Sequence, residues 1–151
     1  MLTRTRTMSV LCAAVLLVMT VLQFVPYWNF TTEAGDASCS LGGYVWFPRR
    51  HKDLTAYLQG QLGADFTVDR VYAMPAIQLI TGLLGIAFLL LKPALPVGGI
   101  CASVCGIAGL WGYLTNPALR LGGGWALHLL VSALVIVAGV LSIMACFKGK
   151  E

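Results

Sequence analysis

The chain has 151 residues, of which 58% are hydrophobic and only 11% are charged. Charged residues make up about a quarter of an ordinary soluble domain, so this composition excludes that class and predicts one membrane domain spanning the whole chain. The formal net charge is +4. Its basic residues lie in short scattered clusters rather than in a stripe that could follow a phosphate backbone, so nucleic acid is excluded as a partner.

The first apolar run, residues 8–25, follows Arg4 and Arg6. It is long enough to cross a hydrocarbon core of about 30 Å at 1.5 Å per residue. A signal peptide begins with basic residues in the same way. This run, however, leads into Tyr27 and Trp28 rather than into a small-x-small cleavage site, so we expect a retained first membrane helix with aromatic residues at the interface.

Most ionisable groups lie in one polar stretch, residues 26–70, which is predicted to form an extracytoplasmic cap on the helices. The stretch begins with a soft acidic part. Residues 44–47 then form a short strand-like run that Pro48 closes. An amphipathic helix is predicted from Asp53 to Gly63, because its apolar residues recur at helical spacing: Leu54, Tyr57, Leu58 and Leu62.

Three further apolar runs, residues 71–91, 97–114 and 125–147, are predicted membrane helices. The links between them are short, so consecutive helices must be antiparallel neighbours. The third helix carries small residues every three or four positions, which lets neighbouring helices approach closely. These packing residues are Gly98, Ala102, Gly106 and Gly109. The predicted fold is therefore all-α, a four-helix up-down membrane bundle with a cap in the first loop.

Four spans place both termini on one side of the membrane. Basic residues within about 15–20 positions of a span mark the cytoplasmic side. Arg49 and Arg50 lie farther than that from both flanking spans, which favours cytoplasmic termini and an extracytoplasmic loop. The predicted location is a cell membrane, taken as a bacterial plasma membrane.

This plan of a long first outer loop and a short second one resembles that of tetraspan proteins such as claudins. The resemblance covers topology alone. The loop contains Trp28, Cys39 and Trp46, without the Gly-Leu-Trp and the second cysteine of the claudin signature.

The first candidate site is the aromatic and basic run that joins the two parts of the cap. Aromatic anchors beside cations are typical of the headgroup region, so this run is a candidate lipid- or partner-binding site. In it, His51 could act as a neutral base or bind an anionic headgroup, or the run could be a solvated turn. The residues are Trp46, Phe47, Arg49, Arg50 and His51.

A second candidate is a polar pocket between the third and fourth helices. His128 lies one turn inside the fourth helix, where polar groups are expensive, so it either pairs with Tyr113 or Asn116 or reaches the interface. Gln78 is a further polar group of the pocket. No charged residue occurs deep in any span, which argues against a driven transporter.

The five cysteines include no CxxC pair and no zinc-type spacing with histidine. Cys39 alone lies in a polar stretch, as a free thiol or as a bridge between two protomers. Cys101 and Cys105 share a helix face, where they either serve packing or hold a soft metal ion together with ligands from a partner chain. We expect no metal site and no cofactor.

The leading functional hypothesis is a non-enzymatic accessory membrane protein that binds lipids, another membrane protein or a second copy of itself. One alternative is a small oligomeric channel or facilitator with a path along Gln78, Thr81 and His128. Another is a lipid- or quinone-directed membrane enzyme that uses Arg49, Arg50 and His51. Enzymatic activity is the less favoured class.

Overall fold

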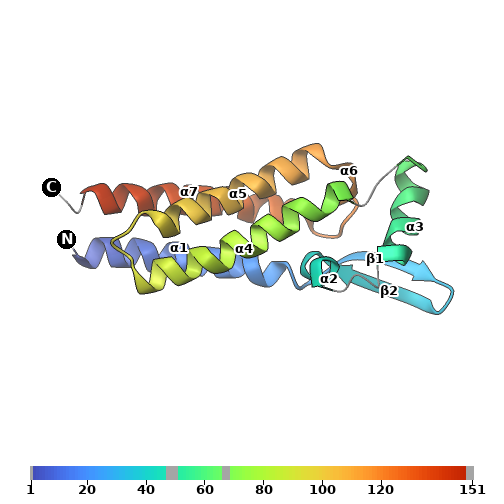
Figure 1. Cartoon of the computed structure of the whole chain (residues 1–151), viewed down its shortest axis with the longest axis horizontal. Coiled ribbons are helices and arrows are strands. Elements are labelled where there is room, and N and C mark those ends of the chain that lie inside the picture. Colours follow the sequence, from blue (N-terminus) through green and yellow to red (C-terminus); the bar gives the residue numbers. More distant parts are fainter. Residues whose placement is uncertain (1, 47–50, 66–68, 149–151) are drawn as a thin grey trace.

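The structure is a computed structural model that describes residues 2–46, 51–65 and 69–148. Long helices form most of it, and a small β-hairpin with short helices lies at one end (Figure 1). In chain order the elements are α1 (Leu2–Leu22), β1 (Pro26–Thr32), β2 (Gly35–Ser40), α2 (Leu41–Trp46), α3 (His51–Leu62), α4 (Asp69–Leu91), α5 (Val97–Thr115), α6 (Pro117–Arg120) and α7 (Trp125–Lys148).

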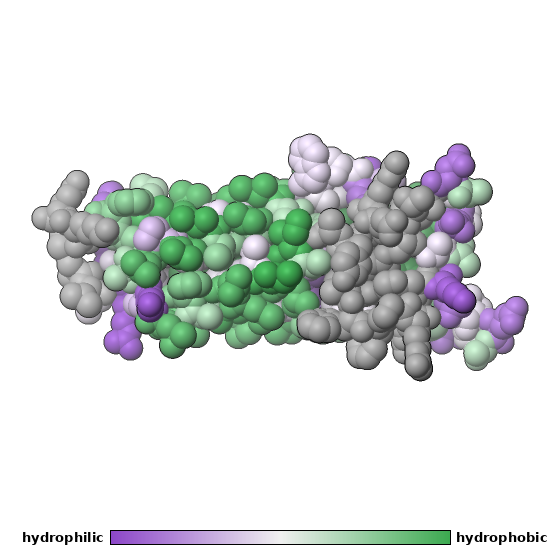
Figure 2. All heavy atoms as spheres, viewed as in Figure 1, coloured by the Kyte–Doolittle hydropathy of each residue, from purple (hydrophilic) through white to green (hydrophobic). Residues whose placement is uncertain are grey.

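Four helices, α1, α4, α5 and α7, are long and apolar enough to cross a membrane. Each of α1 and α5 packs against both α4 and α7, which gives a four-helix bundle. Both termini lie at one end of the bundle and the hairpin at the other (Figure 1). Figure 2 shows a hydrophobic middle and more hydrophilic ends. The prediction of a bundle of four helices long and apolar enough to span a membrane is therefore confirmed, although α1 begins nearer the N-terminus and ends before residue 25.

Glycines allow α5 and α7 to pack with their backbones close together. A Cβ atom added to Gly99 would lie 2.8 Å from the carbonyl oxygen of Gly139, and one added to Gly106 would lie 2.6 Å from that of Ser132. The predicted packing residues Gly98, Ala102, Gly106 and Gly109 are all buried. The small-residue strip therefore faces the interior of the bundle.

Four elements between α1 and α4 make up the cap: β1, β2, α2 and α3. Residues 26–40 form an antiparallel hairpin, which was not predicted, within an otherwise mostly helical fold. The aromatic and threonine-rich β1 has high strand propensity, and its buried rings gain from packing. Gly35 follows the turn with a φ of +115°, a conformation that favours glycine.

A second correction concerns residues 44–46, which belong to helix α2 rather than to the predicted strand. The hydroxyl of Ser40 accepts a hydrogen bond from the N–H of Gly43 at 2.8 Å, the arrangement of a helix N-cap. Leu41 is buried in the first turn of α2. Together, the N-cap at Ser40 and the buried Leu41 favour a helix over the strand that the aromatic residues suggested.

Helix α3 confirms the predicted amphipathic helix, although it begins at His51, two residues earlier. Leu54 and Leu58 are fully buried against β1 and α6, and Gly63 follows the helix with a φ of +108°. The rings of Phe30 and Tyr57 stack with centroids 5.8 Å apart. The apolar face of α3 thus belongs to a core that the cap shares with the end of the bundle.

Candidate functional site

Tyr27 and Trp28 join the cap to the bundle. The hydroxyl of Tyr27 donates a hydrogen bond to the carbonyl of Leu119, and its own carbonyl accepts one from Gly123 at 2.7 Å. Trp28 donates from Nε1 to the carbonyl of Ala118 at 3.0 Å. Both side chains are 1% exposed. Burial raises the pKa of the Tyr27 phenol above its usual range, because desolvation disfavours the phenolate.

His128 lies directly beneath Tyr27. Its Nδ1 atom is 3.0 Å from the hydroxyl oxygen of Tyr113, and the Tyr27 ring meets the imidazole edge-on with centroids 5.0 Å apart. His128 is 3% exposed, so it does not reach open solvent. Of its two predicted partners, Tyr113 is the one present. The Asn116 side chain instead accepts from the N–H of Ala118 and caps α6.

Gln78 belongs to a separate buried network deeper in the bundle. Its Oε1 atom accepts from Gln23 at 2.9 Å, and its Nε2 atom donates to the carbonyl of Cys105 at 3.2 Å and to the hydroxyl of Ser132 at 3.4 Å. Ser132 in turn donates to the carbonyl of His128 at 2.8 Å. The Oε1 atom of Gln23 is buried without a hydrogen-bond donor among the described residues.

The predicted polar pocket therefore divides in two. Tyr113 and His128 lie together at the cap end, whereas Gln78 lies deeper and is linked to His128 through Ser132. Thr81, assigned to the channel path, donates to the carbonyl of Ile77 in its own helix at 2.6 Å. The pairing of Gln23 with Gln78 was not predicted, because no spacing rule indicates which amide on α4 meets Gln23.

The cysteines lie mainly in packed positions. Cys39 is 3% exposed inside the cap core, so its thiol does not face a second protomer in this conformation. Cys105 donates to the carbonyl of Gln78 at 3.5 Å. Within residues 2–46, 51–65 and 69–148, no group of three His, Cys, Asp or Glu side chains is placed to hold a metal ion.

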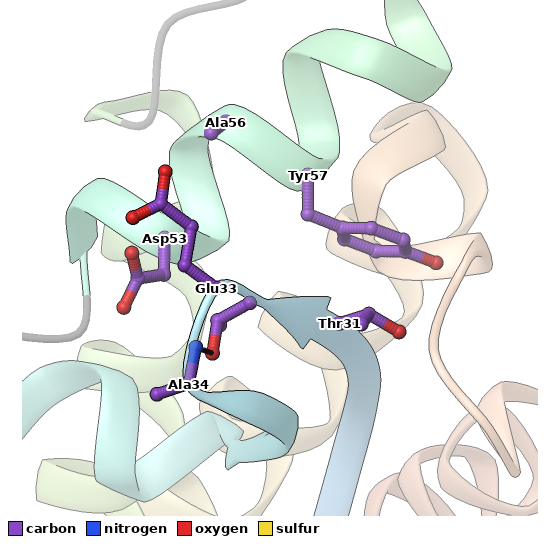
Figure 3. Close-up of a pocket in the computed structure, with 7 residues that line it drawn as sticks. Thr31, Glu33, Ala34, Asp53, Ala56 and Tyr57 are labelled. Atoms are coloured by element: carbon purple, nitrogen blue, oxygen red, sulfur yellow. Dashed lines mark hydrogen bonds between the residues drawn. The ribbon is translucent and has the colours of Figure 1, made fainter.

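A surface cavity of about 640 Å³ lies between the hairpin turn and α3. Glu33 and Asp53 line one side, and Thr31 and Tyr57 line the other (Figure 3). The hydroxyl of Thr32 accepts from the N–H of Ala34 at 3.3 Å and orders the turn. Two carboxylates beside an aromatic ring favour a cationic group.

Sequence reasoning missed this cavity because it did not predict the hairpin. Glu33 lies at the turn and Asp53 in the first turn of α3, and only the folded cap brings them together. Of the predicted lipid- or partner-binding run, Trp46 ends α2 and His51 begins α3. Phe47, Arg49 and Arg50 lie outside the described residues.

Comparison with known proteins found no matching family model, no matching curated protein and no matching solved structure. The class of protein therefore follows from the fold: a mostly helical membrane protein with four candidate spans and a folded cap at one end of the bundle.

Proposed function

We propose that the protein is a non-enzymatic accessory subunit of a bacterial plasma membrane, with cytoplasmic termini, whose extracytoplasmic cap binds a partner membrane protein. The observation that carries this proposal is the cavity lined by Glu33, Asp53 and Tyr57 on a firmly anchored cap. The partner segment is expected to present a lysine or arginine side chain to this cavity.

The arrangement of the bundle favours the cap over the helices as the recognition surface. The small residues of α5 pack against α4 and α7, so they leave no smooth strip for another helix. The exposed large side chains of the four spans are apolar, as in Leu83, Ile107 and Leu134, and suit contact with lipid chains. The cap is where polar and charged groups form a shaped surface.

The charge of the cavity supports a cationic partner. Among the described residues, no lysine or arginine forms an ion pair with Glu33 or Asp53, so both carboxylates are available. The ring of Tyr57 adds a face on which a cation can rest. Exposed ion pairs contribute little affinity by themselves, so these groups select the partner and orient it while a larger surface supplies binding energy.

The proposed orientation follows the distribution of basic residues. Arg4 and Arg6 lie in the first turns of α1, and Lys148 ends α7, at the same end of the bundle (Figure 1). Basic residues close to span ends favour the cytoplasmic side. The cap at the opposite end is then outside the cytoplasm.

The test is affinity purification of the tagged full chain from its native membrane in a mild detergent, followed by quantitative mass spectrometry. Wild type is expected to retain one protein at a fixed ratio. The Glu33→Gln/Asp53→Asn double variant keeps the shape of the cavity and removes its charge, so it is expected to lose at least about 90% of that protein.

The matched control is Lys52→Gln, which changes an exposed charge on α3 that does not line the cavity. This variant is expected to retain the partner. Purification of wild type alone, or equal recovery of the partner with the double variant, would contradict the proposal.

A further inference from the structure

We infer that the His128–Tyr113 pair is a pH-sensitive contact that holds the cap closed on the bundle while His128 is neutral. Protonation of His128 is the event that releases the cap. This inference rests on the contacts between cap and bundle and does not depend on the proposed function.

The position of Tyr27 depends on the rings that it packs against. Its ring contacts the rings of His128 and Tyr113, with centroids 5.0 and 6.5 Å away. Its hydroxyl and carbonyl bind Leu119 and Gly123 in the segment that joins α5 to α7. The position of Tyr27, and with it part of the hold of the cap on the bundle, therefore depends on the imidazole and the phenol of Tyr113 keeping their positions.

The hydrogen bond between His128 and Tyr113 depends on the protonation state of His128. With Nδ1 unprotonated, this nitrogen accepts a hydrogen bond from the hydroxyl of Tyr113. A protonated imidazole carries hydrogen on both nitrogens, so it can no longer accept this bond. The contact then persists only with Nδ1–H donating to the phenol oxygen, and the phenol hydrogen of Tyr113 loses its acceptor.

Protonation also places a positive charge on the buried His128. Among the described residues, the titratable groups facing His128 are two neutral phenols, that of Tyr27 from β1 and that of Tyr113 from α5. Met74 of α4 and the α6 residues Ala118 and Leu119 of the same core carry no titratable group, whereas Arg120 ends α6 and is exposed. On α1 the titratable groups are Cys12 and, in its first turns, Arg4 and Arg6. The described carboxylates lie exposed on the cap or just after it, and none bonds to His128. A buried charge without a counter-ion is costly, so a protonated His128 favours an open, hydrated cap.

Cys39 offers a direct readout of cap opening. It lies opposite Trp28 in the hairpin register, so both residues share the sheet face that packs on the bundle. Its thiol is 3% exposed in the closed cap. Lifting the hairpin from α6 therefore exposes Cys39 together with Trp28.

The experiment measures alkylation of Cys39 by a charged maleimide in the full chain, reconstituted in vesicles and located by mass spectrometry. The rate in denatured chain at the same pH divides out the pH dependence of the thiol itself. The resulting protection factor in wild type is expected to be constant from about pH 8 to about pH 6.5, the pKa of a hydrated histidine, and to fall below that by up to about tenfold per pH unit for one linked proton.

Two variants separate His128 from the carboxylates of the cap. His128→Asn retains an acceptor near the position of Nδ1 but does not titrate, so its profile is expected to be flat. Tyr113→Phe keeps His128 and loses the hydrogen bond, so its protection at about pH 8 is expected to fall by about fivefold, the equivalent of one hydrogen bond. A flat wild-type profile, the same slope in His128→Asn, or unchanged protection in Tyr113→Phe would overturn the inference.

Discussion

The bundle and the cap are held together in opposite ways. In the bundle, α5 and α7 approach closely because glycine has no side chain, at Gly99, Gly106 and Gly139. The contacts of the cap with the bundle depend instead on two large rings, Tyr27 and Trp28, which donate hydrogen bonds to backbone carbonyls. Lipid chains are as apolar as leucine, so helices in a membrane gain from close approach, whereas a cap in water gains from the apolar area that it buries. The bundle should therefore be sensitive to added atoms, and the cap to removed ones.

The largest effect is expected from removing a ring from the cap. Trp28→Ala deletes a buried indole and its hydrogen bond to Ala118, so it should destabilise the cap by about 3–5 kcal/mol. Chemical unfolding in mild detergent micelles, followed by alkylation of Cys39, measures this loss.

Trp111→Ala is the matched control, because Trp111 is 73% exposed on α5. It removes the same side chain from a position that packs against little, so the protection of Cys39 should be unchanged. Equal losses for the two variants would show that the cap is not held by its buried rings.

A smaller effect is expected from adding one methyl group to the bundle. The Cβ atom of Gly106→Ala would approach the backbone oxygen of Ser132 to 2.6 Å, and backbone cannot move aside as a side chain can. Overpacking of this kind costs about 1–3 kcal/mol, measured as a shift in unfolding of the bundle by SDS.

Gly60→Ala makes the same chemical change in α3, where, among the described residues, no atom beyond the neighbouring residues and backbone of the helix itself lies within 4 Å of the added Cβ. Because alanine is the better helix former, this control should stabilise the cap by about 0.5–1 kcal/mol. Destabilisation by Gly60→Ala, or none by Gly106→Ala, would remove the contrast between the two regions.

This contrast also explains what the sequence could predict. Helical periodicity is a local signal, so it located the four spans, the buried strip of α5 and the apolar face of α3. The hairpin was missed because its turn, Glu33-Ala34, lacks the Asn-Gly type of signal. Helix α2 was missed because the aromatic residues 44–47 indicated a strand and the N-cap at Ser40 was not predicted.

The site was harder to predict because its contacts join distant parts of the chain. His128 was recognised as a buried polar group, and Tyr113, fifteen positions away, was one of its two expected partners. Nothing in the sequence indicates that Tyr27, from the first loop, covers the imidazole. The pairing of Glu33 with Asp53 around a cavity depends in the same way on the folded cap.

The smallest effect in the bundle is expected from its polar network. Gln78→Leu leaves the amide of Gln23 without its acceptor and the hydroxyl of Ser132 without a donor, so it should cost about 1–2 kcal/mol. Gln23→Leu should cost less, because it also removes the Oε1 atom that has no donor among the described residues.

The double variant Gln23→Leu/Gln78→Leu separates pairing from packing. If the two amides act as a pair, its cost in SDS unfolding should be smaller than the sum of the single costs. Strict additivity would mean that the hydrogen bond between them contributes nothing.

The proposed function depends most on which side of the membrane the cap occupies. Asp36 is exposed on β2, and Lys148 is exposed at the opposite end of the bundle, at the end of α7. Single Asp36→Cys and Lys148→Cys variants are treated in intact cells with a membrane-impermeant maleimide, with wild type as the control for the native thiols. We predict that the Asp36→Cys variant is labelled in intact cells and that Lys148→Cys is labelled only after lysis. Labelling of Lys148→Cys in intact cells, with Asp36→Cys protected until lysis, would place the cap in the cytoplasm and contradict the account.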